Sequence, residues 1–230
     1  TLRNRIMTTS HEPAYPEDGM PKERYRAYHV ERAKGGIAMT MTAGSASVSR
    51  DSPPAFNNLL AYKDEIVPWL KAMSDEVHEY DCVVMVQLSH LGRRTGWDKG
   101  DWLPSVAPTR KREPAHMYGQ KLIEDWDIAR IIKDYADAAE RMKAGGVDGI
   151  ELEAYGHLMD QFWSPLTNEL TNEYGGSFEN RTRFLFEIIE DKEPVLLVSD
   201  RVFECTVDGS RMFTSLRTAL RHFEYIRTIY

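Results

Sequence analysis

The sequence has few cysteines and no long apolar stretch. Cys82 and Cys205 are the two cysteines in 230 residues, too few and too far apart for a disulfide framework or a metal site. No apolar run approaches the roughly 18 residues that a membrane-spanning helix needs, and the first residues do not resemble a signal peptide. We therefore expect a protein of the reducing cytoplasm, with no membrane partner and no metal.

An excess of positive charge is also missing. The chain carries 29 Lys and Arg against 36 Asp and Glu, a formal net charge of -7. Proteins that bind nucleic acid concentrate Lys and Arg on one face, so we expect no nucleic-acid partner. A hydrophobic content of 42% with 28% charged residues is typical of a folded globular protein.

No glycine-rich phosphate loop is present: the sequence contains neither G-x-G-x-x-G nor a Walker motif, which argues against Rossmann and P-loop folds.

Short apolar runs alternate with segments of helical period. Strands are predicted at residues 6–9, 37–42, 83–88 and 149–152, and helices over 21–34, 66–77, 128–142 and 177–189. Four such βα units imply a parallel sheet covered by helices. The long connection between residues 90 and 125 is typical of a binding loop, so we expect a barrel-like enzyme with its site at the carboxyl ends of the strands.

The last part of the sequence is too short to complete such a barrel. Four units use about 190 residues, and a full eight-unit barrel needs about 250. The remainder offers one strand, at 195–198, and one helix, at 214–230. We therefore expect an α/β fold that is the N-terminal half of a TIM barrel, truncated after about four to five βα units. Residues 1–189 would form the barrel part and residues 190–230 a separate tail.

Five segments carry a resemblance to a known family. They are residues 2–6, 35–44, 87–93, 148–151 and 161–181, the last containing Asn172-Glu173-Tyr174-Gly175-Gly176-Ser177. In this order they resemble the old yellow enzyme family of FMN-dependent NADH:flavin oxidoreductases, most of all the branch with trimethylamine dehydrogenase, dienoyl-CoA reductase and N-methyl amino acid demethylases. The resemblance covers residues 2–189. It implies an eight-stranded barrel with FMN across its mouth and hydride transfer between flavin N5 and a small substrate.

The resemblance also implies flavin contacts. Ser10 and His11 fall where backbone atoms approach the N5 and O4 edge, and Ala43 and Gly44 fall beside the ring. Gln87 matches a glutamine at the pyrimidine edge, whose donors and acceptors an amide can meet. Glu12 stands where the amine dehydrogenases carry the cysteine that bonds FMN covalently, so a noncovalent flavin is implied.

On the substrate side, His157 matches most nearly the family's substrate-facing histidine. Tyr155 is the second catalytic candidate, and His90 and Arg93 are candidates for substrate binding. The tyrosine that donates a proton in ene reduction has no clear equivalent. The function therefore leans to oxidative demethylation or dehydrogenation of an N-methylated amine or amino acid, with NAD(P)H-linked reduction and an electron-transfer partner as further options.

Structural readings stay open for each candidate. Gln87 is also explained as a polar strand end, His11 as a loop cap, and His90 and Arg93 as loop anchors. The run from Tyr174 to Ser177 is better explained by backbone turns and a helix cap than by chemistry.

A second hypothesis is an inactive half-barrel or a self-associating, non-enzymatic module. Barrels usually hold phosphate on the loops after strands seven and eight, which four or five units do not supply. Open sheet edges also invite pairing with another chain, so self-association is expected.

Overall fold

The computed structural model describes residues 2–42, 46–52, 57–94, 103–114, 117–154, 156–190, 206–207 and 210–211. It divides into two compact units, Leu2–Leu196 and a second made of Thr1 with Leu197–Tyr230. In the second unit, β7 (Thr206–Val207) pairs antiparallel with β8 (Ser210–Arg211). The strand expected at 195–198 and the helix expected at 214–230 lie outside the described residues. The expected boundary after residue 189 stays a prediction.

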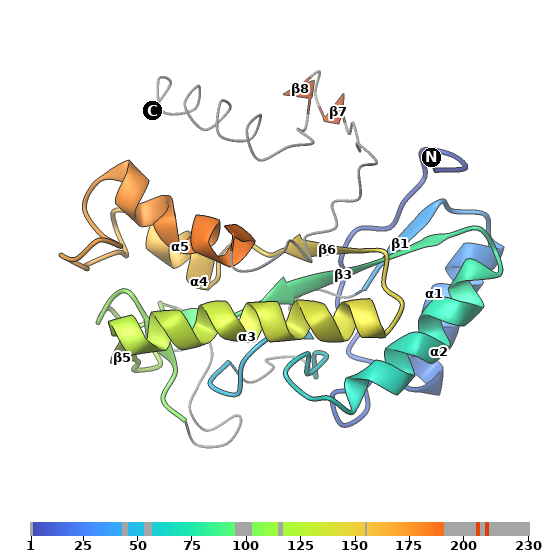
Figure 1. The fold of residues 1–230 in the computed structure, drawn as a ribbon, viewed down its shortest axis with the longest axis horizontal. Helices are drawn as coiled ribbons and strands as arrows, with labels where there is room; N and C mark the ends of the chain where they lie inside the picture. Colours follow the sequence, from blue (N-terminus) through green and yellow to red (C-terminus); the bar gives the residue numbers. More distant parts are fainter. Residues whose placement is uncertain are drawn as a thin grey trace. The chain divides into compact units, whose positions relative to one another are not determined.

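A parallel sheet forms the centre of the first unit (Figure 1). Its middle strand is β3 (Val83–Ser89). Along one edge of β3 run β1 (Met39–Met41) and then β2 (Ala46–Ser47), and along the other runs β6 (Gly149–Leu152). Met7 adds a parallel bridge to Met39, at the place of the first predicted strand. The predicted parallel sheet is confirmed for these four strand positions.

Three helices pack against this sheet: α1 (Glu23–Lys34), α2 (Ile66–His78) and α3 (Asp125–Ala144). Ile66, Leu70, Met73 and Val77 of α2 are completely buried, at the helical spacing that the sequence showed. Val84 and Val86 of β3 are also completely buried against the helices. Because side chains alternate along a strand, Met85 and Gln87 lie on the opposite, inner face of the sheet.

The long connection after β3 contains short elements. They are the 3-10 turn η1 (Gly92–Arg94) and the parallel pair β4 (Val106–Ala107) and β5 (Lys121–Leu122). Two helices follow β6, namely α4 (Leu158–Trp163) and α5 (Phe178–Glu190). Phe162 of α4 stacks on Phe184 of α5 with ring centroids 4.4 Å apart.

The turn before α5 has the structural role expected for it. Ser177 Oγ accepts a hydrogen bond from the Asn180 backbone N–H at 3.2 Å, which caps the helix as predicted. Arg181 Nε donates to the Trp163 carbonyl oxygen at 2.7 Å and ties this turn to α4. These contacts give the polar run from Tyr174 to Arg181 a structural role, and no catalytic role is needed to explain it.

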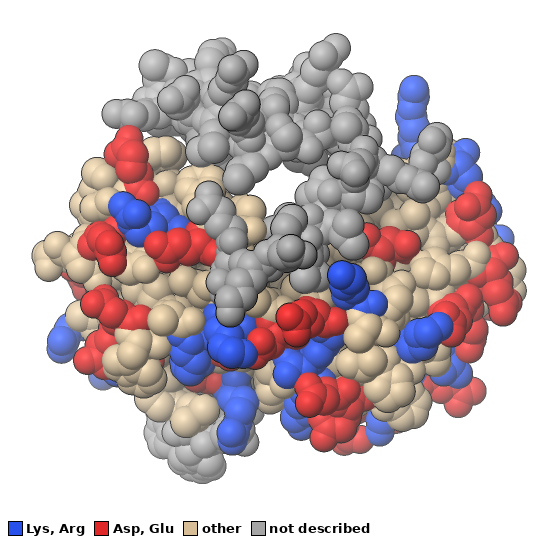
Figure 2. Space-filling model, viewed as in Figure 1, with Lys and Arg blue, Asp and Glu red and all other residues tan. Residues whose placement is uncertain are grey.

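Acidic and basic side chains are interspersed over the face of the molecule drawn in Figure 2, rather than gathered into patches of one sign. In the described part of the chain, no helix combines the length and the apolar character that crossing a membrane requires.

Candidate functional site

The carboxyl ends of the parallel strands bring polar side chains together on the inner face of the sheet. Gln87, which is 7% exposed, lies two residues before the end of β3 and is the register partner of Glu151 on β6. Its Nε2 donates a hydrogen bond to Glu151 Oε1, so both side chains lie on the same face. The predicted cofactor residue Gln87 is thus at the strand ends, with its amide on the inner face.

His157 forms a pair with a carboxylate that the sequence analysis missed. Glu153 follows β6 and extends the ladder, since its backbone N–H donates to the Leu88 carbonyl oxygen at 3.0 Å. It lies two residues beyond Glu151 and therefore shares its face. His157 Nε2 lies 3.2 Å from Glu153 Oε1, and the two side chains are 15% and 17% exposed.

This pairing orients the imidazole ring. Nε2 faces the Glu153 carboxylate, and the other ring nitrogen, Nδ1, can accept a hydrogen bond when the proton is on Nε2. Nδ1 is buried and has no hydrogen-bond partner among the described residues. The spacing Glu153-x-x-x-His157 after a strand was the signal that could have identified the pair.

The loop after the first strand position contains Ser10, which is half-buried, and His11, which is exposed. Glu12 fastens this loop: its Oε1 accepts from the Ala14 N–H at 2.6 Å, and its Oε2 lies 3.3 Å from Asn58 Nδ2. Burial raises the pKa of the Glu12 carboxyl to about 7, against the opposing effect of the Ala14 hydrogen bond. Three other predicted site residues, Ala43, Gly44 and Tyr155, lie outside the described residues.

His90 has a protein partner on each ring nitrogen. Its side chain is completely buried, Nδ1 accepts from the Gly92 N–H at 3.1 Å, and Nε2 lies 3.0 Å from Asp51 Oδ1. Arg93 is held at both ends, with its backbone N–H donating to Gln161 Oε1 at 3.1 Å and its guanidinium to the Lys111 carbonyl oxygen at 3.4 Å. These contacts support the loop-anchor reading of both residues.

Arg94, which the sequence analysis did not single out, is exposed at the end of η1. Its guanidinium has no hydrogen bond or ion pair with any residue that the structure describes. It lies against Gly156, because a Cβ at that position would come within 2.9 Å of Arg94 Nη1. Gly156 also has a φ of +71°, which favours glycine. A cation therefore lies beside the residue that precedes His157.

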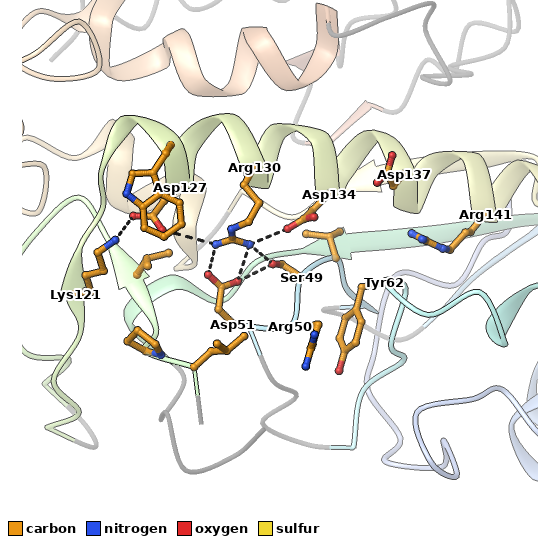
Figure 3. Close-up of a pocket in the computed structure, with 15 residues that line it drawn as sticks. Ser49, Arg50, Asp51, Tyr62, Lys121, Asp127, Arg130, Asp134, Asp137 and Arg141 are labelled. Atoms are coloured by element: carbon orange, nitrogen blue, oxygen red, sulfur yellow. Dashed lines mark hydrogen bonds and ion pairs between the residues drawn. The ribbon is translucent and has the colours of Figure 1, made fainter. Parts of the chain in front are cut away.

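A cavity of about 430 Å³ lies next to α3, and none of the predicted site residues lines it (Figure 3). Several of its charged groups are paired with one another. Arg130 forms ion pairs with Asp51 and, at 2.9 Å, with Asp134, and it donates to Ser49 Oγ at 2.7 Å. Lys121 pairs with Asp127 at 2.8 Å.

Asp51 joins this cavity to His90. Burial alone would raise the pKa of the Asp51 carboxyl, but His90, Ser49 and Arg130 together hold it well below its usual range. The cavity wall is thus a compensated ion network that connects α3 to the end of β3. We assign it a structural role.

Comparison with known proteins identifies the chain. Residues 1–201 match the model of the NADH:flavin oxidoreductase / NADH oxidase family. The chain belongs to this family. The predicted family is therefore confirmed.

The most similar relatives include proteins named for N-methyl substrates. Over 190 residues the chain is 74% identical to a probable N-methylproline demethylase of Rhizobium meliloti and 45% identical to a multifunctional alkene reductase/demethylase of Caballeronia cordobensis. It is 44% identical over 193 residues to an N,N-dimethylglycine/sarcosine dehydrogenase of Chromohalobacter salexigens. Each match covers 83% of this chain but 28% of the relative, so the chain spans little more than a quarter of their length.

Solved structures confirm the fold class. Morphinone reductase superposes with a TM-score of 0.77 at 25% identity, over 82% of this chain and 54% of that protein. A complex of morphinone reductase with tetrahydroNAD gives a TM-score of 0.75 at 26% identity, over 82% of this chain and 56% of that one. The described sheet and helices thus correspond to about half of a TIM barrel of this family.

Proposed function

We propose that this chain is part of an FMN-dependent oxidoreductase that oxidises N-methylated amines or amino acids. The observation that carries the proposal is the group of Gln87, Glu153 and His157 on one inner face at the strand ends, in a chain of this family. The names of the relatives support the same substrate class.

The side chains at these strand ends fit the polar edge of a flavin. The Gln87 side chain offers both an N–H donor and a carbonyl acceptor, as the pyrimidine edge requires, and His157 Nδ1 is a buried acceptor in need of a donor. Ser10 and His11 would approach the ring from the loop fastened by Glu12, and Ala43 and Gly44 would lie beside it. In barrels of this kind the phosphate is held by the loops after strands seven and eight.

Bound flavin supplies the hydride-accepting chemistry, and the protein orients the substrate. We propose that His157, held by Glu153, accepts a hydrogen bond from the substrate at Nδ1, with Tyr155 beside it. His90 and Arg93 would support the substrate side by fixing η1, through Gly92 and through Gln161 of α4. NAD(P)H as reductant, an electron-transfer partner and a cytoplasmic location belong to the proposal as well.

The proposal is tested by anaerobic addition of N-methylproline, sarcosine or NADPH to the flavin-loaded protein that contains this chain. Loss of the oxidised flavin's visible absorbance with an N-methylated amino acid is the expected result. Reduction by NADPH together with no reduction by any N-methylated compound would contradict the amine assignment.

Replacing Gln87 by alanine should weaken FMN binding by about 1–3 kcal/mol, because the flavin's polar edge loses its amide partner. The measurement is a fluorescence titration of FMN into the apoprotein that contains this chain. Gln120→Ala is a matched control, since Gln120 donates to the Thr109 carbonyl oxygen in the long connection. If the dissociation constant of FMN is unchanged in Gln87→Ala, Gln87 does not bind the flavin and has a structural role, as in its hydrogen bond to Glu151.

The inactive or self-associating half-barrel is the second candidate. Among the described strands, β6 pairs with β3 alone, so its other edge has no described partner. Ile6 and Met7 are 62% and 38% exposed. An open edge at β6, together with exposed apolar side chains beside β1 at the other edge of the sheet, favours pairing with another chain.

The isolated 230-residue chain should therefore self-associate and bind FMN weakly or not at all. Size-exclusion chromatography with light scattering, run with and without FMN, measures both properties. A stable monomer that carries one flavin per chain would refute this expectation.

A further inference from the structure

The loop between the first strand position and α1 is fastened on both sides of its predicted flavin contacts. Before them, the Thr8 N–H donates to the Met39 carbonyl oxygen of β1 at 3.1 Å. After them comes Glu12, whose carboxyl group accepts two hydrogen bonds. Ser10 and His11 lie between these two anchors, so the position of their backbone depends on both.

We propose that Glu12 is a positioning residue for the flavin, and that flavin affinity depends on whether its carboxyl group is ionised. The ionised form would hold the loop in place for the ring, and the protonated form would release one of its fastenings. This inference rests on the proposed function, because Ser10 and His11 are predicted flavin contacts. It adds to that function a residue that acts through the loop.

The Glu12 carboxyl group joins two segments that are far apart in the sequence. Its Oε1 accepts from the Ala14 N–H at 2.6 Å, and its Oε2 accepts from Asn58 Nδ2 at 3.3 Å, 46 residues later. We call these two contacts the Glu12 clamp. Ala14 has a φ of +56°, a conformation that a residue other than glycine adopts at a cost, and the clamp holds it there.

The segment that contains Asn58 is itself bound to the sheet. Asn58 is buried, and the carbonyl oxygen of the next residue, Leu59, accepts from the Ser47 N–H of β2 at 2.8 Å. The Glu12 clamp therefore connects its loop to β2, while Thr8 connects the same loop to β1. A change at Glu12 would loosen one of these two connections and leave the other intact.

The proton on Glu12 decides whether both contacts of the clamp can form. A carboxylate accepts hydrogen bonds at both oxygens, whereas a carboxylic acid carries a donor on one of them. Since Ala14 and Asn58 both present N–H groups, protonation would place two donors against each other at one contact. Burial raises the pKa of the Glu12 carboxyl to about 7, although the Ala14 hydrogen bond favours the ionised form.

Neighbouring charges do not account for this balance. The titratable and charged side chains of the surrounding segments are His11, Glu17 and Asp18 on the same loop, Lys22, Glu23 and Arg24 at the start of α1, and Lys63 beyond Asn58. In the described part of the chain, none of them forms an ion pair with Glu12. Asp18 pairs instead with Lys22 at 2.6 Å. The ionisation of Glu12 is therefore governed by its burial and its hydrogen bonds.

Flavin should accordingly bind more tightly as the pH rises through this range. A ring that binds the fastened loop favours the ionised carboxyl group, so it lowers the pKa of Glu12 from its value in the flavin-free protein. The contribution of the Glu12 clamp to affinity is then complete above about pH 7 and is lost as the pH falls below that value.

The test is a fluorescence titration of FMN into the apoprotein that contains this chain, from about pH 5.5 to about pH 8.5. Wild-type affinity should rise about 10-fold, as expected for one hydrogen bond to a charged group. Glu12→Gln keeps an acceptor for Ala14 but turns a donor towards Asn58, so it should bind at every pH as weakly as the wild type does in acid. Riboflavin is titrated in parallel, because it lacks the phosphate group, whose second ionisation near pH ~6 also changes the charge of FMN.

Glu17→Gln is the matched control, since Glu17 is an exposed carboxylate on the same loop and should keep the wild-type pH profile. Circular dichroism establishes that each variant is folded, and the wild-type profile with riboflavin tests the proposal without any variant. A pH dependence that Glu12→Gln retains, or that disappears with riboflavin, would overturn the Glu12 clamp, as would an affinity that falls with rising pH. If the expected profiles are found but no N-methylated amino acid reduces the flavin, the proposed substrate class fails and the clamp stands.

Discussion

Replacing His157 by alanine should slow reduction of the flavin by an N-methylated amino acid roughly 100- to 10,000-fold, the range expected when a positioned acid–base side chain is removed. The reason is geometric. His157 combines a buried Nδ1, which has no partner among the residues that the structure describes, with a ring that lies 3.2 Å from Glu153 through Nε2. Without the imidazole, the substrate loses its acceptor at the strand ends. Anaerobic stopped-flow measurement of flavin reduction gives the rate.

The affinity for FMN should change far less in this variant, because the predicted flavin contacts come from other residues. His78→Ala is a suitable control, since His78 is an exposed residue of α2 that pairs with Asp148. His157→Asn keeps a donor for Glu153 without an imidazole and should recover little of the rate. A wild-type reduction rate in His157→Ala would remove this residue from the site.

The strands and helices were predictable because each has a simple period. The four completely buried residues of α2 recur at three- and four-residue intervals, and the valines of β3 alternate with Met85 and Gln87. The boundaries were less exact. The first helix begins at Glu23 rather than at Pro21, and the first strand is reduced to the Met7–Met39 bridge. Such differences depend on neighbouring elements, which a local pattern does not contain.

Side-chain partners that are far apart in the sequence could not be predicted from a local period. His90 was a candidate for substrate binding, with a loop anchor as the alternative. Its Nε2 lies beside Asp51, 39 residues earlier, and this contact exists only once β2 and β3 are paired. Arg94 has no motif that marks it. It lies against Gly156 because Gln161 of α4 holds η1 through the Arg93 N–H and the Leu91 carbonyl oxygen. The candidate site therefore combines residues that resemblance indicated with residues that only the fold identifies.

The second large effect concerns stability. Replacing Arg130 by alanine should lower the free energy of unfolding by about 2–4 kcal/mol, since it removes the guanidinium from the buried Asp51 carboxylate and leaves that charge to His90 and Ser49. Asp51 is 6% exposed at its side chain and pairs with Arg130, which is itself 35% exposed, so the loss is set below the full value for a buried pair. Urea unfolding, monitored by circular dichroism, measures the change.

The pH dependence of this loss distinguishes its cause. In the wild-type protein the pKa of Asp51 is held below its unfolded value, so its ionic contacts stabilise the fold above that unfolded value and are lost as pH falls. The cost of Arg130→Ala should therefore be largest near neutral pH and shrink in acid, where Asp51 becomes protonated more readily without the guanidinium. Lys133→Ala is the matched control on the same helix, because the Lys133–Asp137 pair is exposed and should contribute less than about 0.5 kcal/mol. If the two variants lose equal stability, with no dependence on pH, the network around Asp51 does not fasten α3 to the end of β3.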